Sequence, residues 1–563
     1  MVSDFFFPNC GGVENHIYQL SQCLMRLGHK VVVISHAYGD CCGVRYLSNG
    51  LKVYYLYRTP VYLQSTLPTL LGPMHMLRLI AVREGATLLH AHQAFSTLGL
   101  EAALCGCTMG LPVVFTDHSL FGFADAASIV MNKLLKFILA DVHHVICVSH
   151  TSKENTVLRA CLPPSRVSVI PNAVNAVDFL PAGMPSNATG EASDGGGGGG
   201  GGRDGSGGGG GSGRGHSGSG RGGSGSGGGG SRGSGGGGSC GSGGRQHSGL
   251  HSGQQQQSGQ QRRQQNGQQQ QRQQQQQQQS EQRKQQSEQR QQSEQQQQQQ
   301  LRAPFASAPA WPRDPMRDPV TIVSLSRLVY RKGIDLLALV IPVVCAAHPN
   351  VRFIVGGDGP KRALLQATVE QHGLQERVTL VGEVPPEKAR DFLVQGHIFL
   401  NASLTEAFCM AIVEAASVGL RVVSTRVGGV PEVLPPDMVV LADPSAEGLI
   451  AALETTLLQL PAADTHAQHA RVASMYSWQA VAQRTIAAYG AALSTRRDGS
   501  LLARLRRYAA CGLFGGPVFA AVAVAAHMLW RTLRWLRPES SIPRAPDWPR
   551  RREWPRANAE AEQ

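Results

Sequence analysis

Short apolar runs alternate with longer amphipathic stretches in two separate parts of the chain. In the first 180 residues the runs are rich in β-branched side chains and lack polar alternation, which is typical of parallel strands buried on both faces. A helix is expected over residues 14–27, ending at Gly28. The strands predicted in this part are residues 31–35, 53–57, 87–90, 113–116, 145–148 and 167–170.

The same pattern returns between residues 320 and 460, again with helical spacing between the apolar runs. Alternating strands and helices predict α/β layers with a parallel sheet in each part. Two Rossmann-like domains, at residues 1–180 and 314–495, are expected to face each other across a ligand-binding cleft. The strands predicted in the second part are residues 320–324, 351–355, 379–381, 397–400, 422–424 and 438–441.

The first strand of the chain is unusually short. Only Met1, Val2 and Ser3 precede a loop that runs from Asp4 to Gly12, whereas strands usually have about five or six residues. We therefore expect either that the natural start lies upstream or that the gene model is truncated.

The two α/β parts are separated by residues 181–313, where Gly/Ser runs give way to Gln runs. No aromatic residue occurs between Phe179 and Phe305, so this segment cannot bury enough apolar surface to offset its chain entropy. We expect a disordered spacer at a domain junction. Arg-Gly pairs at Arg214 and Arg221 leave open a non-catalytic scaffold with an RNA-binding tract.

Near the C-terminus the chain is uncharged from Cys511 to Trp530. A run of about 20 residues is long enough to cross a bilayer, so we predict one transmembrane helix at 511–530 and a tail at 531–563. A buried hairpin or a surface helix is the alternative. Arginines on both sides of the run leave its orientation undetermined by charge.

The composition indicates which kinds of partner the chain binds and in which cellular compartment it folds. A net charge of +13 over 563 residues favours anionic ligands or membrane surfaces. The 12 cysteines show neither zinc spacing nor a disulfide framework, so reduced cytosolic thiols are expected. The first residues lack a basic start and a long apolar run, so no secretory signal is expected.

Two carboxylates flank the start of a predicted helix in the second part. Glu406 lies at or just before that start and Glu414 about two turns inside, roughly 12 Å further along the axis. First-turn N–H groups attract phosphate, so the arrangement suits a nucleotide-sugar with hydroxyls at both ends. A capped amphipathic helix with solvated Glu residues is the plain alternative. The residues expected to offer the free N–H groups are Ala407, Phe408, Cys409 and Met410.

Basic and Gly-rich turns follow several predicted strands. Arg327 and Lys332 lie where α/β folds bind ligands, beyond the carboxyl end of a strand. Arg offers a bidentate fork and Lys a point charge to a diphosphate, although a basic surface turn has the same pattern. Gly11 and Gly12 open the first helix, which allows a ligand to approach the backbone.

Histidines supply the remaining candidate chemistry. His118 follows the strand at 113–116, where it either hydrogen-bonds a sugar hydroxyl, shapes the reacting centre or is structural. His90 and His92 have a metal-like spacing, but no carboxylate or third ligand is near them in sequence, so no metal is predicted.

Several motifs together resemble known families. The motifs Gly11-Gly12-Val13-Glu14, Ser326-Arg327 with Lys332-Gly333, Gly357-Asp358-Gly359-Pro360, Glu406-x7-Glu414 and Gly428-Gly429-Val430-Pro431-Glu432 resemble retaining GT-B glycosyltransferases of the sucrose and glycogen synthase family. The runs at 121–125, 152–156, 170–173, 328–335, 404–416 and 424–429 resemble the PIG-A family, the catalytic subunits of phosphatidylinositol N-acetylglucosaminyltransferase.

This resemblance implies a UDP-GlcNAc donor, a phosphatidylinositol acceptor and the first step of GPI-anchor synthesis. It implies that Glu414 holds the ribose, Glu406 contacts the transferred sugar, and Arg327 and Lys332 neutralise the diphosphate beside Gly11 and Gly12.

The resemblance also implies retention of configuration, no metal or other cofactor, and no nucleic acid partner. Further subunits are expected in a complex at the endoplasmic reticulum membrane, with the catalytic domains in the cytosol. The sequons at Asn187 and Asn401 are then expected to stay unmodified. A related transferase with another acceptor or donor, for instance a phosphatidylinositol mannosyltransferase, remains an alternative.

Overall fold

The computed structural model describes most of the chain outside the long low-complexity segment. The described residues are 1–9, 11–62, 64–120, 126–184, 311, 314–460, 464–495, 497–513 and 515–546. Most of the predicted disordered spacer, residues 185–310 and 312–313, and the end of the tail therefore lie outside the described residues, as does Asn187. Both α/β parts belong to one compact unit of the fold.

The N-terminal domain is built on strands β1 to β9. Three strands pair in the order β2-β3-β1, and four more pair in the order β6-β7-β8-β9. Val2 lies between the two groups and joins them into one sheet, because it bridges Ile34 of β1 and Ala91 of β6. The short first strand thus lies at the centre of this sheet. Pairing in this sheet is parallel except between β2 and β3, and β4 and β5 form a separate antiparallel pair. The strands are β1 (Val32–His36), β2 (Gly43–Tyr46), β3 (Lys52–Leu56), β4 (Pro60–Tyr62), β5 (Ser65–Thr66), β6 (Leu89–His92), β7 (Val113–Asp117), β8 (His144–Cys147) and β9 (Val167–Val169).

The C-terminal domain has one parallel six-stranded sheet in the order β12-β11-β10-β13-β14-β15. Each strand is an apolar run that is buried against helices on the sheet faces, as its composition predicts. The strands are β10 (Val320–Leu325), β11 (Val351–Gly356), β12 (Val378–Gly382), β13 (Ile398–Asn401), β14 (Arg421–Thr425) and β15 (Val439–Ala442).

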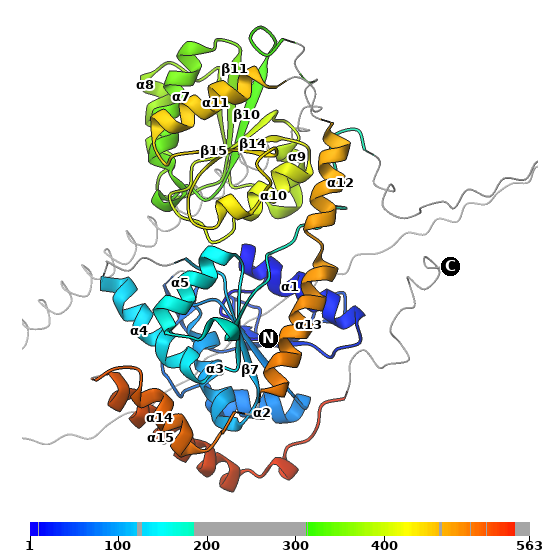
Figure 1. The fold of residues 1–563 in the computed structure, drawn as a ribbon. Helices are drawn as coiled ribbons and strands as arrows, with labels where there is room; N and C mark the ends of the chain where they lie inside the picture. The colour runs from blue at the N-terminus through cyan, green and yellow to red at the C-terminus, as the bar shows by residue number, and fades with distance from the viewer. Residues whose placement is uncertain are drawn as a thin grey trace, which may run out of the picture. The chain divides into compact units, whose positions relative to one another are not determined.

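Helices cover both sheets, and the last ones return to the N-terminal domain (Figure 1). After α12 packs on α10, α13 packs on α1 and near β7 and β8. The helices are α1 (Gly12–Arg26), α2 (Met74–Glu84), α3 (Thr97–Met109), α4 (Ala126–Asp141), α5 (His150–Ala160), α7 (Ile334–Ala347), α8 (Arg362–Gln371), α9 (Ala389–Leu393), α10 (Met410–Ser417), α11 (Ala446–Leu458), α12 (Thr465–Met475), α13 (Trp478–Ser494), α14 (Leu501–Ala509) and α15 (Gly515–Leu536).

Helix α15 is the one described helix that is long and apolar enough to cross a membrane. It begins at Gly515, four residues after the predicted start, because the chain turns between α14 and α15. One side of α15 packs on the N-terminal domain, where Phe519 stacks on Phe137 with ring centroids 4.2 Å apart. The rest of the helix is mostly exposed, as in a single-pass membrane anchor.

A buried charge network docks α14 on the same domain. Asp141 is the last residue of α4. Its carboxylate forms ion pairs with Nε of Arg504 and Nη2 of Arg507, each at 2.6 Å. Tyr508 donates its hydroxyl to Asp141 at 2.9 Å. Burial raises the pKa of Asp141, but the two arginines outweigh burial and the net shift is downward. Arg504 and Arg507 are therefore tied to the fold and are not free flanking charges.

Candidate active site

The predicted basic turn and the predicted acidic loop meet at an ion pair. Lys332 ends the turn after β10, and Glu406 lies between β13 and α10. The Lys332 ammonium contacts the Glu406 carboxylate, and the Ser403 hydroxyl donates to that carboxylate at 2.8 Å. Burial lowers the pKa of Lys332, but Glu406 and Cys409 reverse that shift, so the ammonium stays charged.

Gly333 brings these two loops together. Its φ is +68°, and a Cβ there would lie 1.7 Å from the carbonyl oxygen of Ala402. Only glycine combines this left-handed conformation with such a close approach. A backbone hydrogen bond also joins the two loops, because the Leu404 N–H donates to the Arg331 carbonyl at 2.9 Å.

Glu414 lies in the second turn of α10 and has a different environment. The side chain is half-buried, and within the described part of the chain no hydrogen bond or ion pair contributes to the pKa of its carboxyl. Burial alone raises the pKa of Glu414 to about 7. An unpaired carboxyl of this kind is ready to accept hydrogen bonds from ligand hydroxyls.

The start of α10 corrects one prediction. The helix begins at Met410, later than expected, and Cys409 precedes it with φ +73°. The free first-turn N–H groups are therefore at Met410 and Ala411, not at Ala407 and Phe408. The Phe408 side chain is buried and packs edge-on against Tyr476, at 5.6 Å between ring centroids, so this side chain belongs to the core.

The Gly-rich turn at Gly428 and Gly429 is hydrogen-bonded to the loop that carries Glu406. The Gly429 N–H donates to the Glu406 carbonyl at 2.9 Å. Glu432, three residues on, accepts from the backbone N–H groups of His150 at 2.5 Å and Thr151 at 2.8 Å. These amides begin α5, so Glu432 of the C-terminal domain caps a helix of the N-terminal domain. This cap was not predicted from the sequence, although Glu432 stands in one of the motifs quoted above.

Gly11 and Gly12 lie at the start of α1, as predicted. Gly11 is the N-cap in an extended conformation, and Glu14 occupies the first turn. Burial raises the pKa of Glu14, and the positive charge of Arg327 opposes that rise. The charge of Arg327 also lowers the pKa of Lys332. Arg327 therefore lies near both Glu14 and Lys332, which connects the Gly11-Gly12 turn with the basic turn. Glu14 was missed as a site residue, although it stands in the quoted motif.

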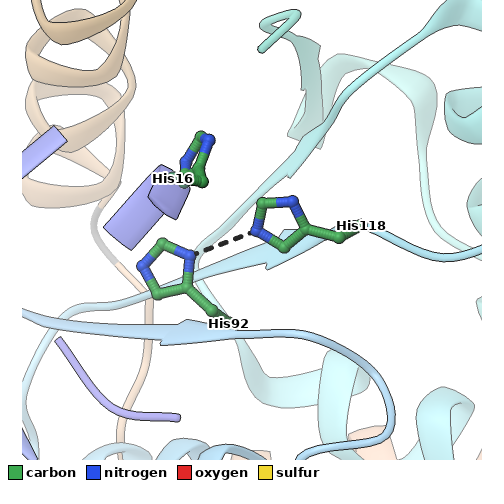
Figure 2. Close-up of side chains that lie close together, drawn as sticks. All are labelled: His16, His92 and His118. Atoms are coloured by element: carbon green, nitrogen blue, oxygen red, sulfur yellow. Dashed lines mark hydrogen bonds between the residues drawn. The ribbon is translucent and has the colours of Figure 1, made fainter. Parts of the chain in front are cut away.

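His118 directly follows β7, as predicted, and belongs to a cluster of three imidazoles (Figure 2). His92 ends β6 and His16 lies on α1, and one ring nitrogen from each of the three lies within 4.8 Å of the other two. Burial lowers the pKa of His16 to about 4 and the pKa values of His92 and His118 well below the usual range. The argument that His92 lacks a third ligand nearby is therefore wrong, because His16 and His118 come from distant parts of the sequence.

Asn401 is buried and donates its side-chain amide to Ser424 at 2.9 Å. A glycan on this amide would disrupt its hydrogen bond to Ser424 in the folded sheet, and the expectation that the sequon stays unmodified remains a prediction.

Comparison with solved structures shows the fold. Sucrose-phosphate synthase from Thermosynechococcus elongatus superposes with a TM-score of 0.51 at 16% identity, over 85% of this chain and 93% of that chain. The catalytic domain of starch synthase IV from Arabidopsis thaliana gives 0.51 at 13% identity, over 88% and 98%. Both are GT-B proteins, and the two parallel sheets described above have that arrangement.

Comparison of sequences shows the family. Residues 36–125 match the family described as PIGA (GPI anchor biosynthesis), and residues 312–471 match glycosyl transferases group 1. The corresponding phosphatidylinositol N-acetylglucosaminyltransferase subunit of Arabidopsis thaliana is 44% identical over 97% of this chain and 93% of its own length. Its Homo sapiens counterpart is 40% identical over 96% and 86%. The chain is thus a group 1 glycosyltransferase of GPI-anchor biosynthesis and belongs to the PIGA family of phosphatidylinositol N-acetylglucosaminyltransferase subunits.

Proposed function

We propose that this chain transfers GlcNAc from UDP-GlcNAc to phosphatidylinositol with retention of configuration, at the membrane of the endoplasmic reticulum. Family membership supports the reaction. The observation that carries the site is the unpaired carboxyl of Glu414, one helix turn beyond the free N–H groups of α10 and on the same loop–helix segment as Glu406, the partner of Lys332.

Glu414 would hold the donor's ribose. A ribose presents two neighbouring hydroxyls, and a carboxylate offers two acceptor oxygens to match them. Pairing with hydroxyls would return the hydrogen bonds that burial has removed from this carboxyl, so donor binding would favour its ionised form.

The donor diphosphate would lie against the positive groups beside this helix. Arg327 and Lys332 would supply charge, the N–H groups of Met410 and Ala411 would supply the helix start, and Gly12 would leave room for the phosphates, since a Cβ there would meet nothing within 4 Å. Groups fixed in advance in this way stabilise the charge that develops on the leaving diphosphate. Cys409 would border the same site through its strained backbone.

The transferred sugar would contact Glu406 and His118. In the reaction an acceptor hydroxyl oxygen of inositol bonds to the anomeric carbon, while the bond from that carbon to the β-phosphate oxygen breaks. The electron pair leaves with UDP, and the hydroxyl proton passes to a diphosphate oxygen on the same face. Attack from the face that the leaving group vacates preserves the configuration of the anomeric carbon.

The membrane helix would serve the lipid acceptor. Anchoring by α15 keeps the N-terminal domain near phosphatidylinositol, with both catalytic domains in the cytosol and other subunits of the transferase bound to the chain. The names of the relatives, which are subunits, support such a complex.

Complementation of cells that lack the first step of GPI-anchor synthesis tests the proposal. The wild-type chain is expected to restore anchored proteins at the cell surface, whereas Glu414→Ala at equal protein level is not. Glu447→Ala, which removes an exposed acid from the first turn of α11, is the matched control. Full rescue by Glu414→Ala would refute the assigned site. Competition between UDP-GlcNAc and GDP-mannose in the membranes distinguishes a mannosyltransferase.

A further inference from the structure

We propose that His16, His92 and His118 form a binding site for a single transition-metal ion of the zinc class. The three residues come from α1, from the end of β6 and from the residue after β7 (Figure 2). Three imidazoles with one position left open are a donor set that zinc commonly uses in proteins. Neither the family comparisons nor the proposed transfer reaction assigns a metal to these side chains.

Asn172 prepares His16 as a ligand. Its side-chain oxygen lies 2.8 Å from Nδ1 of His16, so this nitrogen carries the proton that it donates. The other nitrogen, Nε2, then keeps its lone pair. Metal-binding histidines usually have such an outer partner, which fixes the ring and its tautomer. His16 and Asn172 are both buried, so the arrangement is held firmly.

The spacing of His92 and His118 fits two ligands better than a hydrogen-bonded pair. Nδ1 of His92 lies 3.4 Å from Nε2 of His118, beyond the range of about 2.7–3.2 Å for N–H bonds. Two nitrogens bound tetrahedrally to one zinc, at about 2.0–2.1 Å each, are separated by roughly 3.3–3.4 Å. The observed 3.4 Å between these two nitrogens therefore matches the distance between two ligands of one tetrahedral zinc ion.

His92 also has an unsatisfied atom. Its Nε2 is buried and has no hydrogen-bond partner among the described residues. A ring that is only packed into the core in this state leaves a polar atom uncompensated, which is unfavourable. Coordination through Nδ1 would leave Nε2 as the protonated nitrogen, and the bond to the ion would offset the cost of burying that N–H group.

The neighbouring His90 is excluded as a ligand. Its Nδ1 lies 2.8 Å from the Tyr489 hydroxyl and its Nε2 lies 2.6 Å from Thr116 Oγ1, so both nitrogens are used. The site therefore has three protein ligands and a fourth position for water. His118 is partly exposed, unlike the other two, and gives the ion a route of entry.

Cobalt binding tests the proposal directly. The full-length chain in detergent, freed of metal and without donor, is titrated with Co²⁺, whose visible absorption identifies tetrahedral coordination. One Co²⁺ per chain, displaced by Zn²⁺, is expected. His92→Ala is expected to abolish these bands, and Asn172→Ala to weaken binding about 10- to 100-fold. His144→Ala, which removes a buried histidine outside the cluster, is expected to bind like the wild type.

Absence of tetrahedral Co²⁺ bands in the wild type would overturn the proposal, as would wild-type affinity in His92→Ala. Circular dichroism of each variant shows whether it is folded. If His92→Ala is unfolded, X-ray absorption of the Zn²⁺-loaded wild type decides instead: scattering from three imidazoles supports the site, and any other ligand set refutes it. Because no donor is present, the result does not depend on the proposed transfer reaction, in which His118 has a separate role.

Discussion

Lys332 and Glu406 form an ion pair between two loops that are 74 residues apart in the chain. The pair joins the turn after β10 to the loop before α10. In the proposed reaction the lysine stabilises the leaving diphosphate and the glutamate contacts the transferred sugar, so each holds the other in place before the donor binds.

Replacing Lys332 by alanine is expected to lower the rate of GlcNAc transfer by at least about 100-fold, because a positioned charge is lost at the leaving group. The rate is measured in membranes with labelled UDP-GlcNAc. Arg471→Ala removes a cation from an exposed ion pair with Asp437 and is expected to leave the rate unchanged. Equal rates in the two variants would contradict the role of Lys332.

Donor binding is expected to depend on the ionisation of Glu414. Since the pKa of this carboxyl is about 7 in the folded chain without donor, UDP-GlcNAc should bind about tenfold more weakly for each pH unit below that value. Calorimetric titration at several pH values checks this expectation. The pH dependence should disappear in Glu414→Gln; its persistence there would assign it to another group.

The same pKa predicts how stability changes with pH. A carboxyl whose pKa rises on folding, here from 4.5 to about 7, makes no difference below pH 4.5. Ionisation then costs stability progressively as the pH rises through this window, and the full cost is present above it. Glu414→Gln should therefore unfold at a higher urea concentration than the wild type at pH 8, and the advantage should shrink toward pH 4.5.

Gly333→Ala is expected to be far more destabilising than Gly373→Ala. Both glycines have a positive φ, but a Cβ at Gly373 meets nothing within 4 Å, whereas at Gly333 it overlaps the Ala402 carbonyl. The Gly373 variant should lose about 1–2 kcal/mol of unfolding free energy from backbone strain alone. The Gly333 variant should lose more than about 4 kcal/mol. Urea unfolding measures both, and similar losses would show that the loop moves aside freely.

Asp141→Asn is expected to release α14 from the N-terminal domain. It leaves the buried guanidinium group of Arg504 and the half-buried one of Arg507 without their anion, and loss of the partner of a buried charge typically costs about 3–5 kcal/mol. Limited proteolysis between α13 and α14 should accelerate. Asp437→Asn, at an exposed pair with Arg471, is the control and should be cleaved at the wild-type rate.

Deleting residues 195–300 is expected to preserve complementation, because lengthening or shortening a connecting loop changes its closure free energy only slowly. The deleted chain is compared with the full-length chain for surface display of anchored proteins at equal expression. A complete loss of rescue by a stable deleted protein would favour the scaffold interpretation of this segment.

The strands could be predicted from sequence because central parallel strands are nearly continuous apolar runs, and each of the 12 predicted strands overlaps an observed one. The start of α10 was placed too early because Cys409 takes a left-handed conformation, which composition does not reveal. The His16–His92–His118 cluster and the pairing of Asp141 with Arg504 were missed for another reason. They depend on which distant segments become neighbours, and one sequence contains no direct measure of that.

The return of the chain to its first domain through α13, followed by the docking of α14 and α15, divides the work between the two halves of the enzyme. The half built from the first 180 residues packs against α14 and α15, so in the proposed reaction this half lies beside the membrane that holds the lipid acceptor. The other half, which carries Lys332, Glu406 and Glu414, would bind the nucleotide-sugar donor from solution. In the proposed reaction, phosphatidylinositol would arrive by diffusion in the bilayer and UDP-GlcNAc by diffusion in water. The supply of each reactant could therefore change independently of the supply of the other.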